Sequence, residues 1–191
     1  MIDGLEHNKI FCINGKVEKI DFAFEDKNKI EINEDFKLQN KLENNNSLID
    51  LNSAFINKSY KILVKENYSF NKPLIVYHTS NNKIKSKNIN LRLEFELEQN
   101  SSLRLIDFFN DTSEKNFVNI FYTFDLKKDA ILKNYKIDKT NNNNIRYSFN
   151  NINQEENSIS ETFILSAGSN ILKNEINSNL NGKYSTSFVN Y

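Results

Sequence analysis

Apolar and polar residues alternate through most of the second half of the chain. In residues 91–98, Leu and Phe alternate with Arg and Glu, and the same two-residue period returns after several short polar turns. Successive side chains of a β-strand point to opposite faces, so this period predicts half-buried strands with one apolar face. The positions expected to face the core are Leu91, Leu93, Phe95, Leu97, Val118, Ile120, Tyr122, Phe124, Leu172, Ile176 and Leu180.

A polar turn with a small residue recurs between these strands, and no helical pattern separates them. The recurring pairs are Asn100-Ser101, Asp129-Ala130, Asn157-Ser158, Ser169-Asn170 and Asn181-Gly182. Two all-β architectures fit this pattern: an antiparallel sandwich or barrel, and a β-solenoid whose strands stack rung on rung. The uneven spacing of the turns leaves both architectures open.

The N-terminal part is organised differently. Two short apolar segments flank Asn14-Gly15, the strongest short signal for a β-hairpin. The polar segment 35–46 predicts a variable loop or a frayed helix. Residues 47–55 predict the one convincing helix, with Ser47 as its cap. We therefore divide the chain into residues 1–46, a hairpin with a polar loop, and residues 47–191, the core.

Composition limits the classes of function. Lys plus Arg equal Asp plus Glu at 25 each, so no basic surplus favours nucleic acid as a partner. No apolar run approaches the roughly 20 residues that cross a bilayer, and the N-terminus lacks the layout of a signal peptide. These features predict a cytoplasmic protein that binds neither membrane nor nucleic acid. Four glycines placed singly exclude a Gly-rich phosphate loop.

Cysteine and histidine give no catalytic pattern. The single cysteine, Cys12, excludes an internal disulfide and a multi-cysteine metal cage within this chain. On a strand it is expected to be an inert small hydrophobe. His7 is expected to be exposed near the terminus, and His78 to have a structural or surface role. No G-x-S-x-G motif is present.

The carboxylates of two strands are the remaining candidates for chemistry. Glu94, Glu96 and Glu98 share one strand face, which suits a cation, a carbohydrate cleft or a solvated face paired with Lys or Arg. The clean alternation favours the solvated face. Asp107 shares the parity of apolar neighbours, so it is either partly buried in a specific hydrogen-bonding role or returns to solvent at the strand end. The latter is favoured. No catalytic, cofactor-binding or metal-binding residue is assigned.

Several segments, in order along the chain, resemble the SufB/SufD core family of the SUF iron–sulfur cluster assembly system. The resemblance rests on these segments: Phe11-Cys12-Ile13-Asn14-Gly15, Leu51-Asn52-Ser53-Ala54-Phe55, Ile62-Leu63-Val64-Lys65, Lys72-Pro73-Leu74-Ile75-Val76, Arg92 to Phe108, and Gly168 to Tyr184. The Asn14-Gly15 hairpin and the compact spacing after it are more similar to SufD than to SufB. Lys173 departs from the family's usual Arg, and Asn57-Lys58 replaces its Asp-Gly turn.

The resemblance implies a fold and a set of partners. The fold is a right-handed parallel β-helix, a single-stranded solenoid with an N-terminal hairpin and one short helix, with Gly168 and Gly182 at corners. Further rungs, the helical domain that contacts the ATPase, and the family's proposed cluster-assembly cysteine and histidine have no counterpart here. We therefore expect a C-terminally truncated core. Its terminal rung, near Tyr184, Phe188 and Tyr191, should be exposed and prone to self-association.

The implied function is that of a SufD-like, non-catalytic scaffold subunit. It would bind a SufB-like protein as a heterodimer and a SufC-like ATPase. An iron–sulfur cluster would bind only at a site shared with a partner, because one cysteine supplies too few ligands. Two alternatives remain: a carbohydrate-active lyase or hydrolase that uses Glu94, Glu96 and Asp107, and a purely structural solenoid.

Overall fold

The computed structural model describes residues 2, 4–34, 46–56, 58–80, 87–110, 115–139, 142–167 and 169–191. These residues contain one α-helix, α1 (Ser47–Phe55), and one short 3-10 helix, η1 (Lys27–Lys29). The strands are β1 (Asn8–Ile13), β2 (Lys16–Asp21), β3 (Ile30–Glu34), β4 (Tyr60–Val64), β5 (Leu74–Thr79), β6 (Asn88–Leu97), β7 (Ser102–Phe109), β8 (Phe117–Leu126), β9 (Ile131–Asp138), β10 (Asn142–Gln154), β11 (Ile159–Ser166), β12 (Ser169–Leu180) and β13 (Thr186–Asn190).

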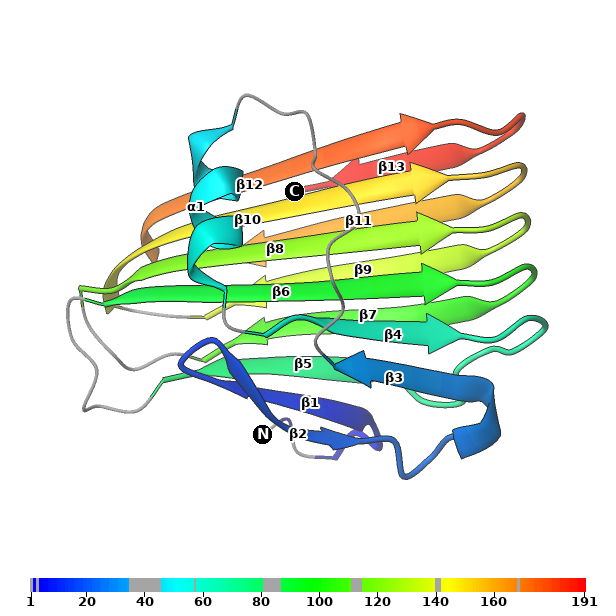
Figure 1. Cartoon of the computed structure of the whole chain (residues 1–191), viewed down its shortest axis with the longest axis horizontal. Helices are drawn as coiled ribbons and strands as arrows, with labels where there is room; N and C mark the ends of the chain where they lie inside the picture. The colour runs from blue at the N-terminus through cyan, green and yellow to red at the C-terminus, as the bar shows by residue number, and fades with distance from the viewer. Residues whose placement is uncertain are drawn as a thin grey trace.

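The strands form two facing sheets that the chain visits alternately. The seven-stranded sheet has the order β13-β11-β9-β7-β5-β1-β2, and the six-stranded sheet the order β12-β10-β8-β6-β4-β3. From β4 onwards, neighbouring strands within each sheet are parallel, so each rung stacks on the one before it (Figure 1). The structure confirms a parallel β-solenoid of about four turns and excludes the antiparallel sandwich.

The predicted hairpin closes the N-terminal end of the solenoid. Strands β1 and β2 pair antiparallel around Asn14 and Gly15, whose φ angles of 53° and 75° are those of a tight hairpin turn. Strand β1 also pairs in parallel with β5, and β3 pairs antiparallel with β4. Both sheets therefore begin with N-terminal strands. The division of the chain at residue 46 stays a prediction.

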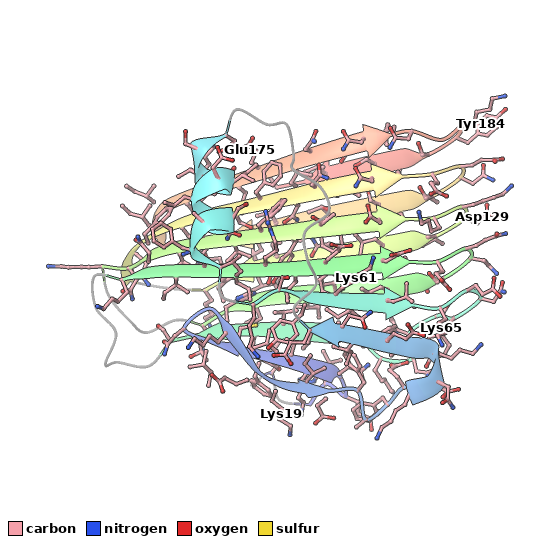
Figure 2. All side chains as sticks on the ribbon, viewed as in Figure 1. Lys19, Lys61, Lys65, Asp129, Glu175 and Tyr184 are labelled. Carbon is pink, nitrogen blue, oxygen red and sulfur yellow. The ribbon has the colours of Figure 1, made fainter. Side chains whose placement is uncertain are left out.

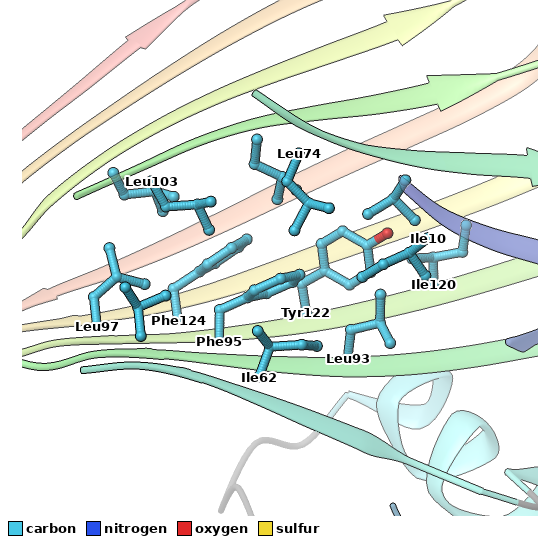
Figure 3. Close-up of a cluster of buried hydrophobic side chains, with 14 of the residues drawn as sticks. Ile10, Ile62, Leu74, Leu93, Phe95, Leu97, Leu103, Ile120, Tyr122 and Phe124 are labelled. Carbon is cyan, nitrogen blue, oxygen red and sulfur yellow. The ribbon is translucent and has the colours of Figure 1, made fainter. Parts of the chain in front are cut away.

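The apolar core lies between the two sheets. The eight core positions predicted on β6 and β8 are all buried. Because the strands are in register, equivalent side chains stack in columns, and the rings of Phe95 and Phe124 lie 5.3 Å apart (Figure 3). On β12, Leu172 and Ile176 are only partly buried, and Leu180 is 53% exposed. They face inward as predicted, but no described rung covers them.

Helix α1 packs on the outward face of the six-stranded sheet, against β6 and β8. Its cap is Asn46, whose side chain accepts a 3.0 Å hydrogen bond from Leu48 N, and not Ser47 as predicted. The buried Asn52 donates to the carbonyls of Leu91 and Asn119 on the sheet, at 3.2 and 2.9 Å. The rest of the loop predicted before this helix lies outside the described residues. Within those residues no helix is long and apolar enough to span a membrane.

One corner of the solenoid repeats the same backbone conformation in each rung. The residues with positive φ at this corner are Asn67, Asn100, Asp129, Asn157 and Tyr184, at 55–59°. Each of the middle three precedes a buried small residue, Ser101, Ala130 or Ser158, which confirms the predicted turns there. In the last rung the left-handed position falls on Tyr184, two residues beyond Gly182 in the predicted turn.

Gly182 is expected to be required in the last corner. A Cβ atom at this position would lie 2.0 Å from the backbone nitrogen of Glu156 in the rung below. Replacing Gly182 with Ala should therefore lower the free energy of unfolding by about 1–3 kcal/mol, measured by urea denaturation. Lys183→Ala, an exposed neighbour, is the control and should change little; equal effects of both substitutions would contradict the close approach. The other predicted corner glycine, Gly168, lies outside the described residues.

Candidate functional site

A buried polar cluster lies inside the solenoid where the core changes from apolar to polar side chains. The in-register strands β7 and β9 place Asp107 beside Lys136, and their charged groups lie 3.7 Å apart. Nε2 of His78 lies 2.5 Å from Asp107 Oδ1. The Tyr122 hydroxyl, from the opposite sheet, donates to the same oxygen at 2.9 Å. One carboxylate thus links side chains of both sheets and three successive rungs.

Burial and the neighbouring charges oppose each other in this cluster. Burial raises the pKa of Asp107, but His78, Lys136 and Tyr122 outweigh it and hold this pKa below its usual value of 3.8. Burial lowers the pKa of Lys136, an effect that Asp107 partly offsets. Burial together with Asp107 raises the pKa of Tyr122 well above its usual value. The carboxylate is therefore stabilised in its charged form and Tyr122 in its neutral form.

A second ion pair and a small cavity adjoin the cluster. Arg146 bonds to Asp138, and its guanidinium lies 4.1 Å from the centre of the Phe109 ring. Cys12, His78 and Arg146 are among the residues that line a cavity of about 20 Å³, which is room for one water molecule. Burial raises the pKa of Cys12, so its thiol stays protonated and is poorly suited to bind metal or to act as a nucleophile.

The structure corrects two expectations about these residues. Asp107 is completely buried and hydrogen-bonded, and does not return to solvent. His7 is also buried, and its Nε2 lies 2.7 Å from the Tyr77 hydroxyl. His78 is buried and bonded to Asp107, so it has the structural role, one of the two roles expected for it. Since Asp107 and His78 are enclosed, a polymeric substrate cannot reach this cluster, and its chemistry is that of a buried charge network.

The acidic strand face on β6 is confirmed as a surface paired with lysine. Lys61 on β4 lies 3.2 Å from a carboxylate oxygen of Glu94 and 2.5 Å from one of Glu96. Glu98 instead accepts a hydrogen bond from the backbone N–H of Glu66 at 2.9 Å. Among the described residues no group of three or more His, Cys, Asp or Glu side chains is arranged to hold a metal ion.

The last rung that the structure describes consists of β12 and β13. Strands β12 and β13 lie at the edges of their sheets, and in the described chain each pairs on one side only. Tyr184 is 82% exposed, Phe188 51% and Tyr191 81%, as predicted for a terminal rung. Tyr184 lies in the turn that follows β12 (Figure 2). Tyr184 has a φ of 59°, a left-handed conformation that is strained for a bulky side chain. An exposed, strained aromatic residue in a corner turn is typical of a contact surface.

Residues 76–191 match the family model described as SUF system FeS cluster assembly, SufBD core domain. The chain belongs to the SufBD core family. The match starts within β5, so it covers the parallel strands from β6 to β13 and the residues of the buried cluster. A search of curated proteins found no match. Membership places the chain in SUF iron–sulfur cluster assembly, where members of the SufBD family work in complexes.

The sequence analysis did not identify Lys136, the positively charged partner of Asp107 in the buried cluster. Lys136 and Asn134 share the parity of the core residue Leu132 on β9, and all three are buried. A lysine on the apolar parity of a regular strand is the signal that could have identified it, because a buried charge requires a partner. The partner itself, Asp107, lies on another rung, and only the register shows that the two meet.

Replacing Asp107 with Asn tests the buried network. The substitution leaves the ammonium of Lys136 buried without its counter-charge, which should lower the free energy of unfolding by about 3–5 kcal/mol. Urea denaturation measures the loss. The control is Glu161→Gln, which removes an exposed carboxylate that lies 3.0 Å from Lys133 and should change stability little. An equally small loss for Asp107→Asn would show that the network does not stabilise the fold.

The network should also make stability fall in acid. The native pKa of Asp107 is below its usual value of 3.8, so its stabilising contribution is complete above that value. The contribution is lost as the pH falls below 3.8 and through the lower native pKa. Urea denaturation between pH 7 and pH 2.5 should show a steeper acid loss for the natural chain than for Asp107→Asn. The ¹³C carboxyl shift of Asp107 gives an independent check; a midpoint at or above 3.8 would contradict the lowered pKa.

Proposed function

We propose that this chain is a SufD-like, non-catalytic scaffold subunit of the SUF system that acts in the cytoplasm. It binds a SufB-like protein through its open terminal rung, and a SufC-like ATPase joins the assembly. The iron–sulfur cluster is cargo of the assembly, bound at a site shared with the partner. The buried, protonated thiol of Cys12 supports this assignment, since cluster ligands are thiolates.

The exposed aromatic residues of the last described rung are the observation that carries the proposal. In the part of the chain that the structure describes, β12 and β13 each pair on one side only, and aromatic side chains are exposed beside them. Such edges readily pair with another chain, and native proteins normally cover or disrupt them. Tyr184 adds a specific argument, because the four corresponding corner positions below it are Asn or Asp, which tolerate left-handed backbone better. A strained Tyr at this position is explained if a partner uses its ring.

The assignment to SufD over SufB rests on the N-terminal hairpin. Asn14 and Gly15 form the turn, and β1 pairs with β5 so that the hairpin is built into the first rung. The balanced charge of the chain supports protein partners over nucleic acid. The carbohydrate-active alternative is not favoured, since Lys61 neutralises Glu94 and Glu96 and Asp107 is enclosed.

Replacing Tyr184 with Asn separates a contact role from a structural one. Asn tolerates the left-handed conformation, so the variant should be more stable than the natural chain by about 1 kcal/mol in urea denaturation. The same variant should bind the SufB-like protein of the same genome at least about 10-fold more weakly, since a central aromatic contact commonly contributes over 1 kcal/mol. Calorimetric titration measures the binding.

Tyr135→Asn is the matched control. Tyr135 is also an exposed tyrosine, but it lies on the outer face of β9, away from the terminal rung. Its replacement should leave binding unchanged. Undiminished binding by Tyr184→Asn would remove the terminal corner from the interface. Failure of the natural chain to bind both the SufB-like protein and the ATPase would refute the proposed function.

A further inference from the structure

A second group of buried polar side chains lies between the two sheets, next to the Asp107 cluster. Asn134 on β9 is 1% exposed, Asn150 on β10 0% and Thr162 on β11 1%. Among the described residues no group bonds to five of their polar atoms, which are Nδ2 and Oδ1 of each asparagine and Oγ1 of the threonine. Buried polar groups in native proteins are nearly all hydrogen-bonded, so these five atoms require a partner.

Asn134 and Asn150 face each other across the interior. Two bonded pairs join the same two strands: Asp138 with Arg146, and Lys136 with Ser148. From the first pair to the second, the position moves by two residues on each strand, in opposite directions. Side chains of a strand return to the same face every two residues, so one further step places Asn134 opposite Asn150. Thr162 stands in register beside Asn134, so the five atoms border one site.

The side chains around this site are smaller than those in the rungs before it. The inward positions that become smaller, in register, are Tyr122 to Asn150, Ile120 to Ser148, and Leu132 to Ser160. The backbones of two stacked sheets stay about 10 Å apart, so the smaller side chains leave room between them. Strands on both sides enclose the site, because β8 and β12 flank Asn150, and β7 and β11 flank Asn134.

The mixture of donors and acceptors decides which ligand fits the site. Each asparagine offers one donor group and one acceptor, and the Thr162 hydroxyl offers both. A cation would use only the oxygen atoms, and the ammonium of Lys136, at the next inward position from Asn134, disfavours a second positive charge. An anion would use only the donors and would leave both amide oxygens unsatisfied. Water both donates and accepts, which matches the whole set.

We propose that the space between Asn134 and Asn150 is a hydration site that binds about two long-lived water molecules, since a buried water makes about three hydrogen bonds and five atoms need partners. The waters bridge the two asparagines and Thr162. They join the sheets at a level where the facing side chains are too short to pack against each other. The site lies within one chain, so it does not depend on which partner the chain binds.

Nuclear Overhauser effects between water and side-chain amides test the site in solution. The amide hydrogens of Asn134 and Asn150 should show cross-peaks of the sign given by water that tumbles with the protein, with rotating-frame spectra excluding chemical exchange. Asn8 is the control, because it is equally buried but its Nδ2 donates to Glu25 Oε1 at 2.6 Å and to the Lys72 carbonyl at 3.2 Å. It should show no such cross-peak. The absence of cross-peaks at both Asn134 and Asn150 would overturn the proposal.

A crystal structure of the chain locates the ligand directly. Density for water is expected about 2.7–3.2 Å from polar atoms of both asparagines. Direct hydrogen bonds between the two amides, or an ion in place of water, would contradict the assignment.

Asn150→Leu separates a hydrated site from a dry one. Leu has nearly the shape of Asn but makes no hydrogen bond. In a hydrated site the substitution deprives the waters and Asn134 of partners, so the midpoint of urea denaturation should fall. In a dry site it removes two unsatisfied buried atoms, so the midpoint should rise, a result that would refute the proposal.

The double variant Asn134→Leu with Asn150→Leu completes the test. It removes four of the five polar atoms together, so its loss should be smaller than the sum of the two single losses. Strictly additive losses would show that the two asparagines do not share a ligand.

Discussion

The parallel hydrogen-bonding register between successive rungs is the constraint on which the rest of the molecule depends. Each rung places its side chains directly above those of the rung before it, so similar side chains form columns. The stacked rings of Phe95 and Phe124 inside, the left-handed residues at the corner and the outward asparagines all follow from this one relation. A change in one rung therefore acts mainly on the rung above and the rung below.

The columns change character along the solenoid. The rungs next to the N-terminal hairpin have an apolar interior, which the hairpin closes. The interior around Asp107 and Lys136 is instead charged and hydrogen-bonded. Toward the open end, polar groups multiply both inside and outside, and the last inward apolar residue of β12, Leu180, is exposed. Apolar burial is thus concentrated in the rungs nearer the N-terminal hairpin.

Most of the architecture was predictable because strand alternation is a local property. The two-residue period gave the inward positions of β6 and β8 correctly, and Asn14-Gly15 gave the hairpin. Charged partners were harder to predict, because they come from different rungs. His7 and Asp107 both looked solvent-accessible from their neighbours in sequence, yet His7 is covered by Tyr77, and Asp107 by His78 and Tyr122.

By itself, the sequence determined the strands, most of the turns, the short helix and the family to which the chain belongs, since each of these depends on residues near one another or on an ordered set of motifs. The turn predicted at Ser169-Asn170 is instead the start of β12. Only the tertiary structure decided which strands stack on one another and in which register. That stacking joins Asp107 to Lys136, links Asn153 on β10 to Asp125 on β8 and to Asn179 on β12, and puts a strained Tyr184 in the corner of the last described rung. The physical reason is that the contacts of a solenoid join residues roughly one turn apart, and the register that brings them together belongs to the folded chain.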